Sequence, residues 1–233
     1  MSAIIFSMKK LLLPVLLLLC SCATHKWVFN LRQAEYLSEA QYEGLTLPPP
    51  PAPGSAIDQA DLAALRGWQA RRTRAQCRRA KAQFYATFDE FYGDLSPFQK
   101  PLPKDTLEIL EQVHNDADIA VAVFKDKYAR PRPFLRDEKL KPCIERVGGK
   151  AYPSGHAAVA RVFALLLADA APERKADFLA RADEAALNRV IAGVHHPTDI
   201  EAGKGLADEV YAQMKLNPSF QADLEKLKAS LKR

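Results

Sequence analysis

The chain has 233 residues, of which 48% are hydrophobic and 26% are charged. These values are ordinary for a globular domain and exclude a disordered or collagen-like chain, and the length suits one sizeable core. The formal net charge is +5, but basic and acidic residues are interleaved along most of the chain. Charge alone therefore predicts a mixed, solvated surface and no nucleic-acid partner.

The N-terminus has the composition of an export signal. Two lysines precede an apolar run from Leu11 to Leu19, which is too short to cross a bilayer stably but suits the core of a signal peptide. Small residues and a cysteine follow, as in a bacterial lipoprotein box, so we expect residues 1–22 to be a signal segment with Cys22 acylated. Cys20 is a poorer acceptor because a bulky leucine precedes it. The alternative is an unlipidated signal peptide cleaved near Ala23.

Export would place the mature protein in the periplasm, anchored to the outer membrane if Cys22 carries lipid. In an oxidising compartment the two remaining cysteines, Cys77 and Cys143, are candidates for one disulfide. Two separate buried thiols fit the sequence equally well. The sequence has no CxxC pair and no Cys/His spacing typical of a structural zinc site.

Residues 23–54 read as a lead-in, and the proline-rich stretch 47–54 within it predicts a stiff spacer or an arm lying on the domain. Residues 55–233 have helical hydrophobic periodicity and no alternating β-branched run long enough to require a strand. We therefore predict an all-α, single-domain helical bundle with its active site at loops and helix ends. The expected helical segments are 55–93 (with Ile57, Leu62 and Leu65 on its apolar face), 104–128, 154–169, 172–192, 198–214 and a charged C-terminal helix.

Three polar blocks follow the first helical segment. The first runs from Lys125 to Pro133, where two prolines end the second helix. Basic side chains at a helix C-terminus are favoured by the helix dipole, which is the purely structural explanation. The functional explanation is that Lys125 and Arg132 converge on an anion, lysine as a point charge and arginine as a bidentate fork.

The second block, Pro153-Ser154-Gly155-His156, directly precedes an apolar helix. Ser154 is placed to cap that helix, which leaves the backbone amides of Gly155 and His156 as donors at its N-terminus. Such a terminus can hold a phosphate, and a glycine there permits close approach to the backbone. The alternative is an ordinary capped helix in which the histidine is incidental.

The third block ends in a helix start. Gly193 ends one helix, and Thr198 with Glu201 predicts a capping box for the next. Asp199 would then lie in the first turn and hold the ring of the histidine at position 195, leaving its other nitrogen as a nucleophile. A structural His–Asp pair is the alternative, and His196 is a rival that these residues alone do not exclude.

Together the blocks supply a lysine, two arginines, a helix N-terminus, two histidines and a carboxylate. Phosphoryl transfer needs fixed positive charge around the phosphoryl oxygens, an in-line nucleophile and an acid for the leaving group. No acidic cluster typical of a Mg²⁺ or Ca²⁺ site accompanies them. We therefore expect no metal ion and no cofactor, with the basic side chains supplying the positive charge.

The order and spacing of the blocks resemble the type 2 phosphatidic acid phosphatase and haloperoxidase superfamily. Its three motifs, Lys-x6-Arg-Pro, Pro-Ser-Gly-His and Arg-x5-His-x3-Asp, match three stretches of this chain in order: Lys125 to Pro133, Pro153 to His156, and Arg189 to Asp199. This spacing selects Arg132 over Arg130 and His195 over His196. The chain combines an expected signal segment with a remainder that has no long apolar span. In this it further resembles the class A bacterial non-specific acid phosphatases, over about residues 47–214.

The resemblance implies a role for each matched residue. His195 would attack phosphorus and form a phosphohistidine, Asp199 would orient it, and His156 would protonate the leaving alcohol and later activate water. The phosphoryl oxygens would bind a further set: Lys125, Arg132, Ser154, the Gly155 amide and Arg189. Since one histidine must be neutral while the other is protonated, we expect a bell-shaped pH profile with a mildly acidic optimum.

One residue departs from the family pattern. Asn188 stands where the family usually has a serine before the arginine of the third motif, and we expect altered phosphate contacts there rather than lost chemistry.

The sequence thus predicts a metal-independent acid phosphatase, a phosphoric monoester hydrolase acting on small phosphomonoesters. Three alternatives are retained. A lipid phosphate phosphatase would use the lipid anchor to reach its substrates, and a vanadium-dependent haloperoxidase would hold vanadate in the same cradle. A non-catalytic envelope lipoprotein would only bind anions. The sequence carries no signal of oligomeric state.

Overall fold

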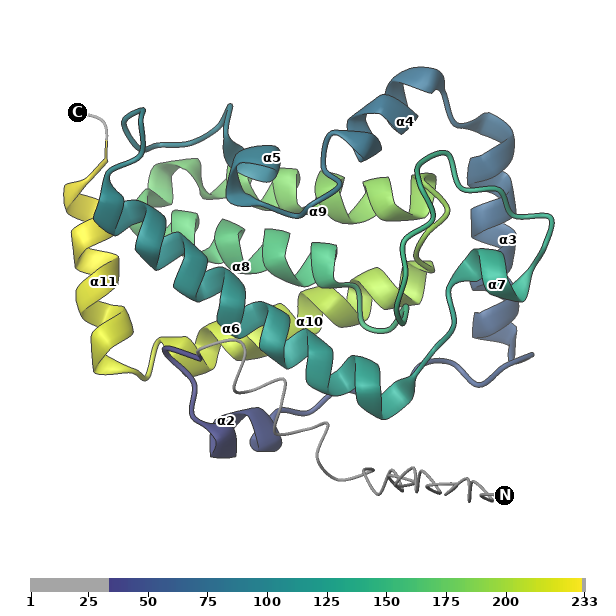
Figure 1. The fold of residues 1–233 in the computed structure, drawn as a ribbon, viewed down its shortest axis with the longest axis horizontal. Helices are drawn as coiled ribbons and strands as arrows, with labels where there is room; N and C mark the ends of the chain where they lie inside the picture. The colour runs from purple at the N-terminus through teal and green to yellow at the C-terminus, as the bar shows by residue number, and fades with distance from the viewer. Residues whose placement is uncertain (1–33, 232–233) are drawn as a thin grey trace, which may run out of the picture.

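The computed structural model describes residues 34–231, and the regular elements of this range are helices, with one isolated β-bridge (Figure 1). The predicted all-α class is confirmed. The expected signal segment with Cys22 and the first part of the lead-in lie outside the described residues. Within residues 34–231, no helix combines the length and the hydropathy needed to cross a membrane.

The helices have the following bounds in chain order: α2 (Glu39–Gly44), α3 (Ala56–Arg71), α4 (Arg74–Lys81), α5 (Phe88–Tyr92), α6 (Lys104–Tyr128), α7 (Pro133–Arg136), α8 (Gly155–Ala170), the 3₁₀ helix η1 (Pro172–Arg174), α9 (Lys175–Ile191), α10 (Pro197–Met214) and α11 (Pro218–Ala229). The second, third, fourth and fifth expected segments and the C-terminal helix are therefore present near their predicted bounds.

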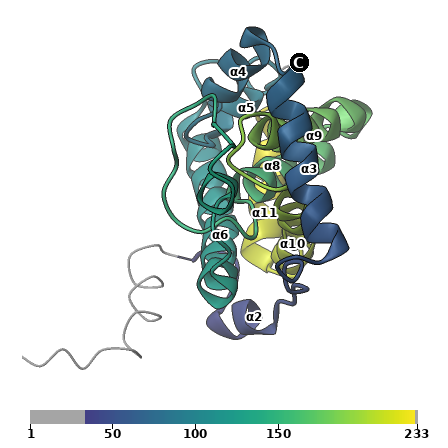
Figure 2. The same ribbon diagram turned by 90° about the vertical axis from the view of Figure 1, so that its right-hand side faces the viewer.

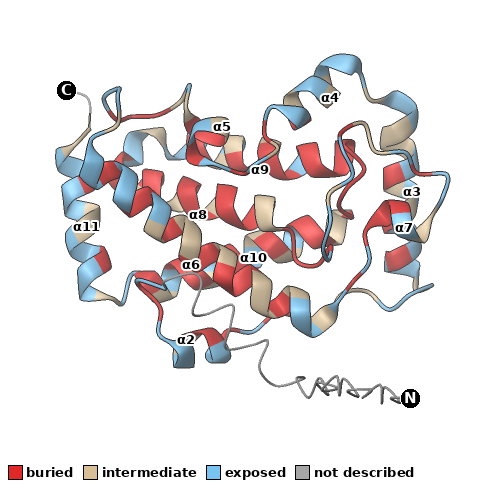
Figure 3. Cartoon of the chain, in the orientation of Figure 1, coloured by how far each residue is buried: buried red, intermediate tan, exposed pale blue. Residues whose placement is uncertain are grey.

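Helix α8 lies at the centre of the bundle because it is apolar on nearly every side. Such a helix needs neighbours all round, and α8 packs against α6, α9 and α10. Viewed from the end, α6 lies on one side of α8, with α9 and α10 on the other (Figure 2). Most of α8 is buried (Figure 3). This packing fixes the N-terminus of α8 at the end of the bundle where α6 and α9 end and α10 begins (Figure 1).

Local sequence explains where the helices near that end stop. Helix α6 ends at Tyr128, and the next residue, Ala129, adopts a left-handed conformation with φ 47° before the two prolines. Helix α9 ends at Ile191, and Gly193 follows with φ 81°, a conformation that favours glycine. Both predicted helix ends are confirmed.

The first helical segment differs from the prediction. It consists of α3, α4 and α5 rather than one continuous helix, because Thr73 and Thr87 each accept a backbone hydrogen bond as N-caps and start a new helix. The apolar face of α3 was also predicted wrongly at one position, since Ile57 is 61% exposed. The buried face instead carries Asp58 and Asp61, which matter for the site described below.

The proline-rich stretch lies on the domain as an arm. Upstream of it, the backbone amide of Tyr36 donates to the buried carboxylate of Asp116 on α6 at 2.7 Å. Along the arm itself, the hydroxyl of Tyr152 donates to the carbonyl of Pro48 at 2.6 Å. These contacts tie the residues upstream of the arm to α6, and the arm itself to the segment just before α8.

A disulfide joins Cys77 of α4 to Cys143, which lies in the long loop between α7 and α8. The backbone amide of Cys143 also donates to the carbonyl of Ala192 at 3.0 Å, at the end of α9. The loop is therefore attached both to α4 and to the end of α9.

A close approach between α10 and the start of α8 depends on Gly203. A Cβ atom on Gly203 would lie 2.5 Å from the carbonyl oxygen of Ser154 and 3.1 Å from the Cβ of Ala157. The backbone amide of Ser154 also donates to the carbonyl of Asp199 at 2.9 Å. The first turns of α8 and α10 are thus held in direct backbone contact.

We expect Gly203→Ala to destabilise the protein by about 1–3 kcal/mol, because the added methyl group overlaps the backbone at Ser154. Urea unfolding followed by circular dichroism measures this change. The matched control is Gly205→Ala in the same helix, where nothing lies within 4 Å of the added Cβ. That control should be neutral or gain about 0.5–1 kcal/mol. Equal stability of the two variants would contradict the proposed close contact.

Candidate active site

The three polar blocks meet at one pocket of about 250 Å³. It lies where α6 and α9 end and α8 begins. Six of the residues selected from the sequence line it: Lys125, Arg132, Gly155, His156, Arg189 and His195. Two others, Ser154 and Asp199, are fully buried and contact each other through their backbones. The fold therefore brings together side chains that are up to 74 positions apart in the chain, from Lys125 to Asp199.

His195 is held between a carboxylate and a guanidinium. Its Nδ1 lies 3.3 Å from Oδ2 of Asp199, and its Nε2 lies 2.6 Å from Nη1 of Arg132. A guanidinium can only donate, so Nε2 is the acceptor and the ring proton is on Nδ1, facing Asp199. This is the tautomer in which Nε2 carries a lone pair toward the pocket.

His196 contacts the same carboxylate but occupies a different place. Its Nδ1 lies 2.9 Å from Oδ2 of Asp199, its Nε2 lies 3.0 Å from Nη1 of Arg136, and its side chain is fully buried. Of the two histidines, the described lining of the pocket includes only His195. The assignment of His195 as the nucleophile, which the motif spacing made, stays a prediction.

The start of α10 differs from the predicted capping box. Pro197 occupies the first helical position, which its fixed φ favours, so the N-cap is His196 rather than Thr198. The His196 amide donates to Oδ2 of Asp199 at 2.7 Å. The predicted box of Thr198 with Glu201 is therefore wrong by two residues, although Asp199 does lie in the first turn.

A buried ion-pair network fixes Asp199 from its other side. Nη1 of Arg130 donates to Oδ1 of Asp199 at 2.6 Å, and Nη2 lies 3.2 Å from Asp58 and 2.9 Å from Asp61. Burial alone would raise the pKa of Asp199, but hydrogen bonds from His195 and His196 outweigh it and hold this pKa well below its usual range. The carboxylate is thus ionised and fixed in place.

Sequence reasoning did not single out Asp58 and Asp61. They share one face of α3 with Leu65, at helical spacings of three and four, and all three are buried. A carboxylate on the buried face of a helix needs a cationic partner, and this was the available signal. The cationic partner of both carboxylates is Arg130. The motif spacing had selected Arg132, and not Arg130, as the phosphate ligand.

Three cations line the pocket in a place that disfavours their charge. Burial lowers the pKa of Lys125 to about 8, with repulsion from Arg132 adding to the effect. Burial likewise lowers the pKa values of Arg132 and Arg189 to about 10. Within the described residues, Nε of Arg189 is one of two buried side-chain nitrogen or oxygen atoms with no hydrogen-bond partner. An anion in the pocket would relieve the repulsion and supply the missing acceptor.

The long loop before α8 positions two of these cations. Nζ of Lys125 donates to the carbonyl of Lys150 at 2.8 Å, and the guanidinium of Arg132 donates to the carbonyls of Gly148 and Gly149 at 3.1 and 3.4 Å. These contacts satisfy part of each donor set while leaving the side chains in the pocket lining.

His156 is held by backbone carbonyls. Its Nε2 lies 3.0 Å from the carbonyl oxygen of Gln83 and 3.1 Å from that of Phe84. Carbonyls only accept, so Nε2 carries a proton and Nδ1 is the other ring atom available for proton transfer. Burial, together with the charge of Arg189, lowers the pKa of His156 well below its usual value, although the two carbonyls oppose this.

The N-terminus of α8 is capped as predicted. Oγ of Ser154 accepts a hydrogen bond from the backbone amide of Ala157 at 3.3 Å. At Gly155, an added Cβ would come no closer than 3.6 Å to its nearest neighbour, a methyl group of Val121. Packing therefore does not require glycine at this position, whereas close approach of an anion to the backbone does favour it.

Asn188 bonds to a residue of the loop between α4 and α5. Its Nδ2 donates to Oε1 of Gln83 at 2.8 Å, and the described pocket lining does not include it. The expected altered phosphate contact at this position stays a prediction. Asn188 instead bonds the residue whose backbone carbonyl holds His156.

Within residues 34–231, no group of three or more His, Cys, Asp or Glu side chains is placed to hold a metal ion.

Comparisons of sequence agree with this arrangement. The model of the PAP2 superfamily matches residues 116–207, which include all three blocks. The chain is 32% identical over 195 residues to a non-specific acid phosphatase of Providencia stuartii, a match covering 78% of this chain and 77% of that protein. It is 34% identical over 137 residues to a non-specific acid phosphatase of Salmonella typhimurium, covering 55% of each.

Two solved structures share the fold at 18% identity. One is a transmembrane PAP2 type phosphatidylglycerolphosphate phosphatase from Bacillus subtilis, with a TM-score of 0.53 over 82% of this chain and 94% of that one. The other is a bacterial vanadium-dependent iodoperoxidase, with a TM-score of 0.59 over 74% of this chain and 52% of that one. At 18% identity, these two structures show only that the fold is shared. The sequence relatives and the family match over all three blocks show that this chain belongs to the PAP2 superfamily.

Proposed function

We propose that this protein is a metal-independent acid phosphatase that hydrolyses phosphomonoesters through a phosphohistidine on His195. The observation that carries the proposal is the setting of His195, with Nδ1 toward Asp199 and Nε2 toward the cation-lined pocket. The names of the sequence relatives in Providencia and Salmonella support the same reaction class.

In the first step, the phosphoryl group of the ester binds among Lys125, Arg132 and Arg189, with the Gly155 amide as a further donor. Arg132 then donates to a phosphoryl oxygen instead of Nε2 of His195. The freed lone pair attacks phosphorus, a P–N bond forms, and the P–O bond to the alcohol breaks. The three cations stabilise the charge on the equatorial oxygens in this transition state.

His156 supplies the proton that the leaving alcohol needs. In the second step it takes a proton from water, which attacks phosphorus while the P–N bond breaks and inorganic phosphate forms. Asp199 holds the imidazole of His195 and stabilises the positive charge that it carries in the phosphoenzyme. Atoms and charges balance over the two steps, and His156 returns to its starting state.

The charge state of His156 favours catalysis at acidic pH. Without an anion, burial and Arg189 keep its pKa low, so the acid form is scarce. A phosphate dianion in the pocket adds negative charge nearby and raises this pKa. Binding of the substrate therefore brings in the proton that the leaving group requires, and lower pH supplies it more readily.

We expect acid quenching of a reaction with a ³²P-labelled phosphomonoester to trap a phosphoenzyme in the wild type. His195→Ala should lose the label and at least about a thousandfold in kcat, because no nucleophile remains. His196→Ala should keep the label. Label that survives in His195→Ala and vanishes in His196→Ala would contradict the nucleophile assignment.

The same experiment separates the alternatives. Absence of both label and turnover would favour an anion-binding lipoprotein, and halide oxidation with vanadate and peroxide would favour a haloperoxidase. Activity lost on treatment with EDTA would contradict the metal-independent mechanism.

We expect kcat/KM to fall as pH rises through about 8, because the Lys125 ammonium is charged below its lowered pKa and neutral above it. The cradle then loses one of its cations. A profile of kcat/KM against pH measures this decrease, which is the alkaline limb of the profile. Lys125→Arg should move it out of the measured range, because a guanidinium stays charged. Lys125→Met should lower kcat/KM at all pH values and remove the limb. A limb near pH 8 that persists in both variants would contradict the assignment.

We expect Asn188→Ala to lower kcat about five- to tenfold with little change in KM, because it removes the hydrogen bond that positions Gln83. The phosphate cradle is untouched, but the carbonyls that hold His156 lose support. The acid limb of the kcat profile should shift as well. Leu187→Ala, an exposed neighbour on α9, is the control and should behave as wild type. A rise in KM at constant kcat would instead indicate a direct phosphate contact.

A further inference from the structure

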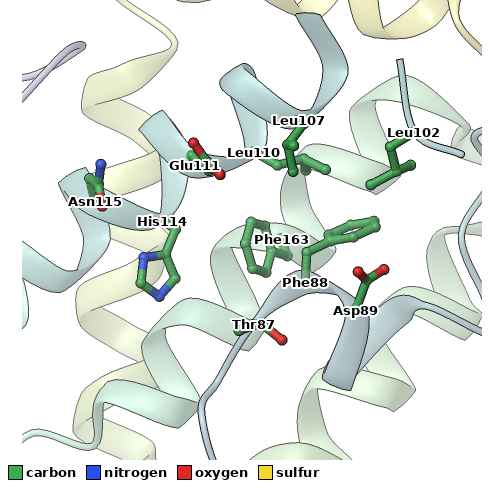
Figure 4. Close-up of a pocket in the computed structure, with 10 residues that line it drawn as sticks. All are labelled: Thr87, Phe88, Asp89, Leu102, Leu107, Leu110, Glu111, His114, Asn115 and Phe163. Carbon is green, nitrogen blue, oxygen red and sulfur yellow. The ribbon is translucent and has the colours of Figure 1, made fainter. Parts of the chain in front are cut away.

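A second pocket, of about 360 Å³ (Figure 4), shares the lining residue His114 with the candidate active site. Its walls come from three distant parts of the chain. Phe88 belongs to α5, Leu107 and Leu110 to the first half of α6, and Phe163 to α8, while Leu102 lies just before α6. The side chains of these five residues are apolar, and the volume falls within the range of small-molecule pockets.

The two pockets are adjacent and share one lining residue. His114 lines both of them, and its ring stacks against Phe163 with centroids 6.3 Å apart. Ala86 also lines the cationic pocket, and the next residue, Thr87, lines the apolar one. In Figure 4, His114 lies at one end of the apolar pocket and Leu102 at the other, with Phe88 and Phe163 between them. His114 therefore marks the place where a group attached to a phosphate in the cationic pocket would enter the apolar one.

The charges of the two pockets differ. The cationic pocket has Lys125, Arg132 and Arg189 in its lining. Among the described residues that line the apolar pocket, the charged ones are Asp89 and Glu111, both acidic. A second phosphate or a carboxylate would be repelled there, whereas an uncharged apolar group would be accepted.

The exposure of the lining is consistent with a ligand site. Leu107 is 45% exposed although it lies on a long, partly buried helix. A single exposed leucine needs no explanation, but this one forms a wall of a concave apolar pocket together with half-buried Leu102. Ligand pockets commonly combine such apolar walls with a few polar groups that fix orientation.

We propose that the apolar pocket binds the alcohol part of the substrate, and that the preferred substrates are phosphomonoesters of uncharged apolar alcohols with one aryl ring or one short alkyl chain. This inference rests on the proposed phosphatase function. The phosphoryl group would occupy the cationic pocket and the alcohol would extend past His114. A pocket of about 360 Å³ suits a single ring or chain better than the two acyl chains of a diacyl lipid.

Binding in this pocket would appear in kcat/KM. Each methylene removed from water favours binding by about fourfold when fully buried, and partial burial lowers that factor. The alcohol stays in the pocket until the P–O bond breaks, so its burial stabilises the transition state along with the ground state. We therefore expect kcat/KM to increase with chain length until the pocket is filled.

The test measures kcat/KM for n-alkyl phosphates from ethyl to octyl, all below their critical micelle concentrations. In the wild type we expect an increase of about two- to fourfold for each added methylene as far as hexyl. Leu107→Gln should flatten this slope while changing kcat/KM for ethyl phosphate less than about twofold. Leu107 is solvent-accessible, so this variant should fold. Leu216→Gln, at a leucine that is 70% exposed and lies after α10, is the matched control and should keep the wild-type slope.

Several outcomes would overturn the inference. A flat slope in the wild type with measurable turnover would do so while leaving the proposed function intact. An unchanged slope in Leu107→Gln would place the apolar contact elsewhere. Faster hydrolysis of a diacyl lipid phosphate in vesicles than of hexyl phosphate would replace the single-chain pocket with a membrane substrate. No hydrolysis of any ester would remove the proposed function and this inference with it.

Discussion

The buried carboxylate of Asp199 is the interaction on which the rest of the site depends. Its Oδ2 accepts from the rings of His195 and His196 and from the His196 amide, and its Oδ1 accepts from Arg130. Removing one partner of such a buried pair leaves an uncompensated charge, which is strongly unfavourable. The position of His195 is thus set by an ion-pair network that also fixes the start of α10.

The two arginines of the first block, Arg130 and Arg132, have different partners. Arg130 faces Asp58, Asp61 and Asp199 and neutralises buried acid, whereas Arg132 contacts His195 and lines the pocket. Two arginines separated by one proline can therefore serve a structural and a ligand-binding role. Because proline prevents helix continuation, successive side chains in this segment need not share one face.

Local signals in the sequence predicted a large part of this arrangement. Helix ends at Tyr128 and before Gly193 follow from proline and glycine, and the cap at Ser154 follows from its place before an apolar helix. The motif spacing gave the pocket-lining residues. Contacts between distant elements could not be predicted in this way. The pairing of Asp58 with Arg130 and of Gln83 with Asn188, and the apolar pocket shared by α5, α6 and α8, arise only when the helices pack.

The three cations that line the pocket have a consequence for turnover. Burial of these charges, with repulsion from Arg132 adding to it at Lys125 and Arg189, disfavours them in the absence of an anion, and a phosphoryl group that enters would offset this cost. Inorganic phosphate carries the same oxygens as the ester and reaches the same donors. If the cradle binds the phosphoryl group as proposed, the enzyme is inhibited by its own product, and phosphate in the surroundings both stabilises the folded chain by mass action and competes with substrate.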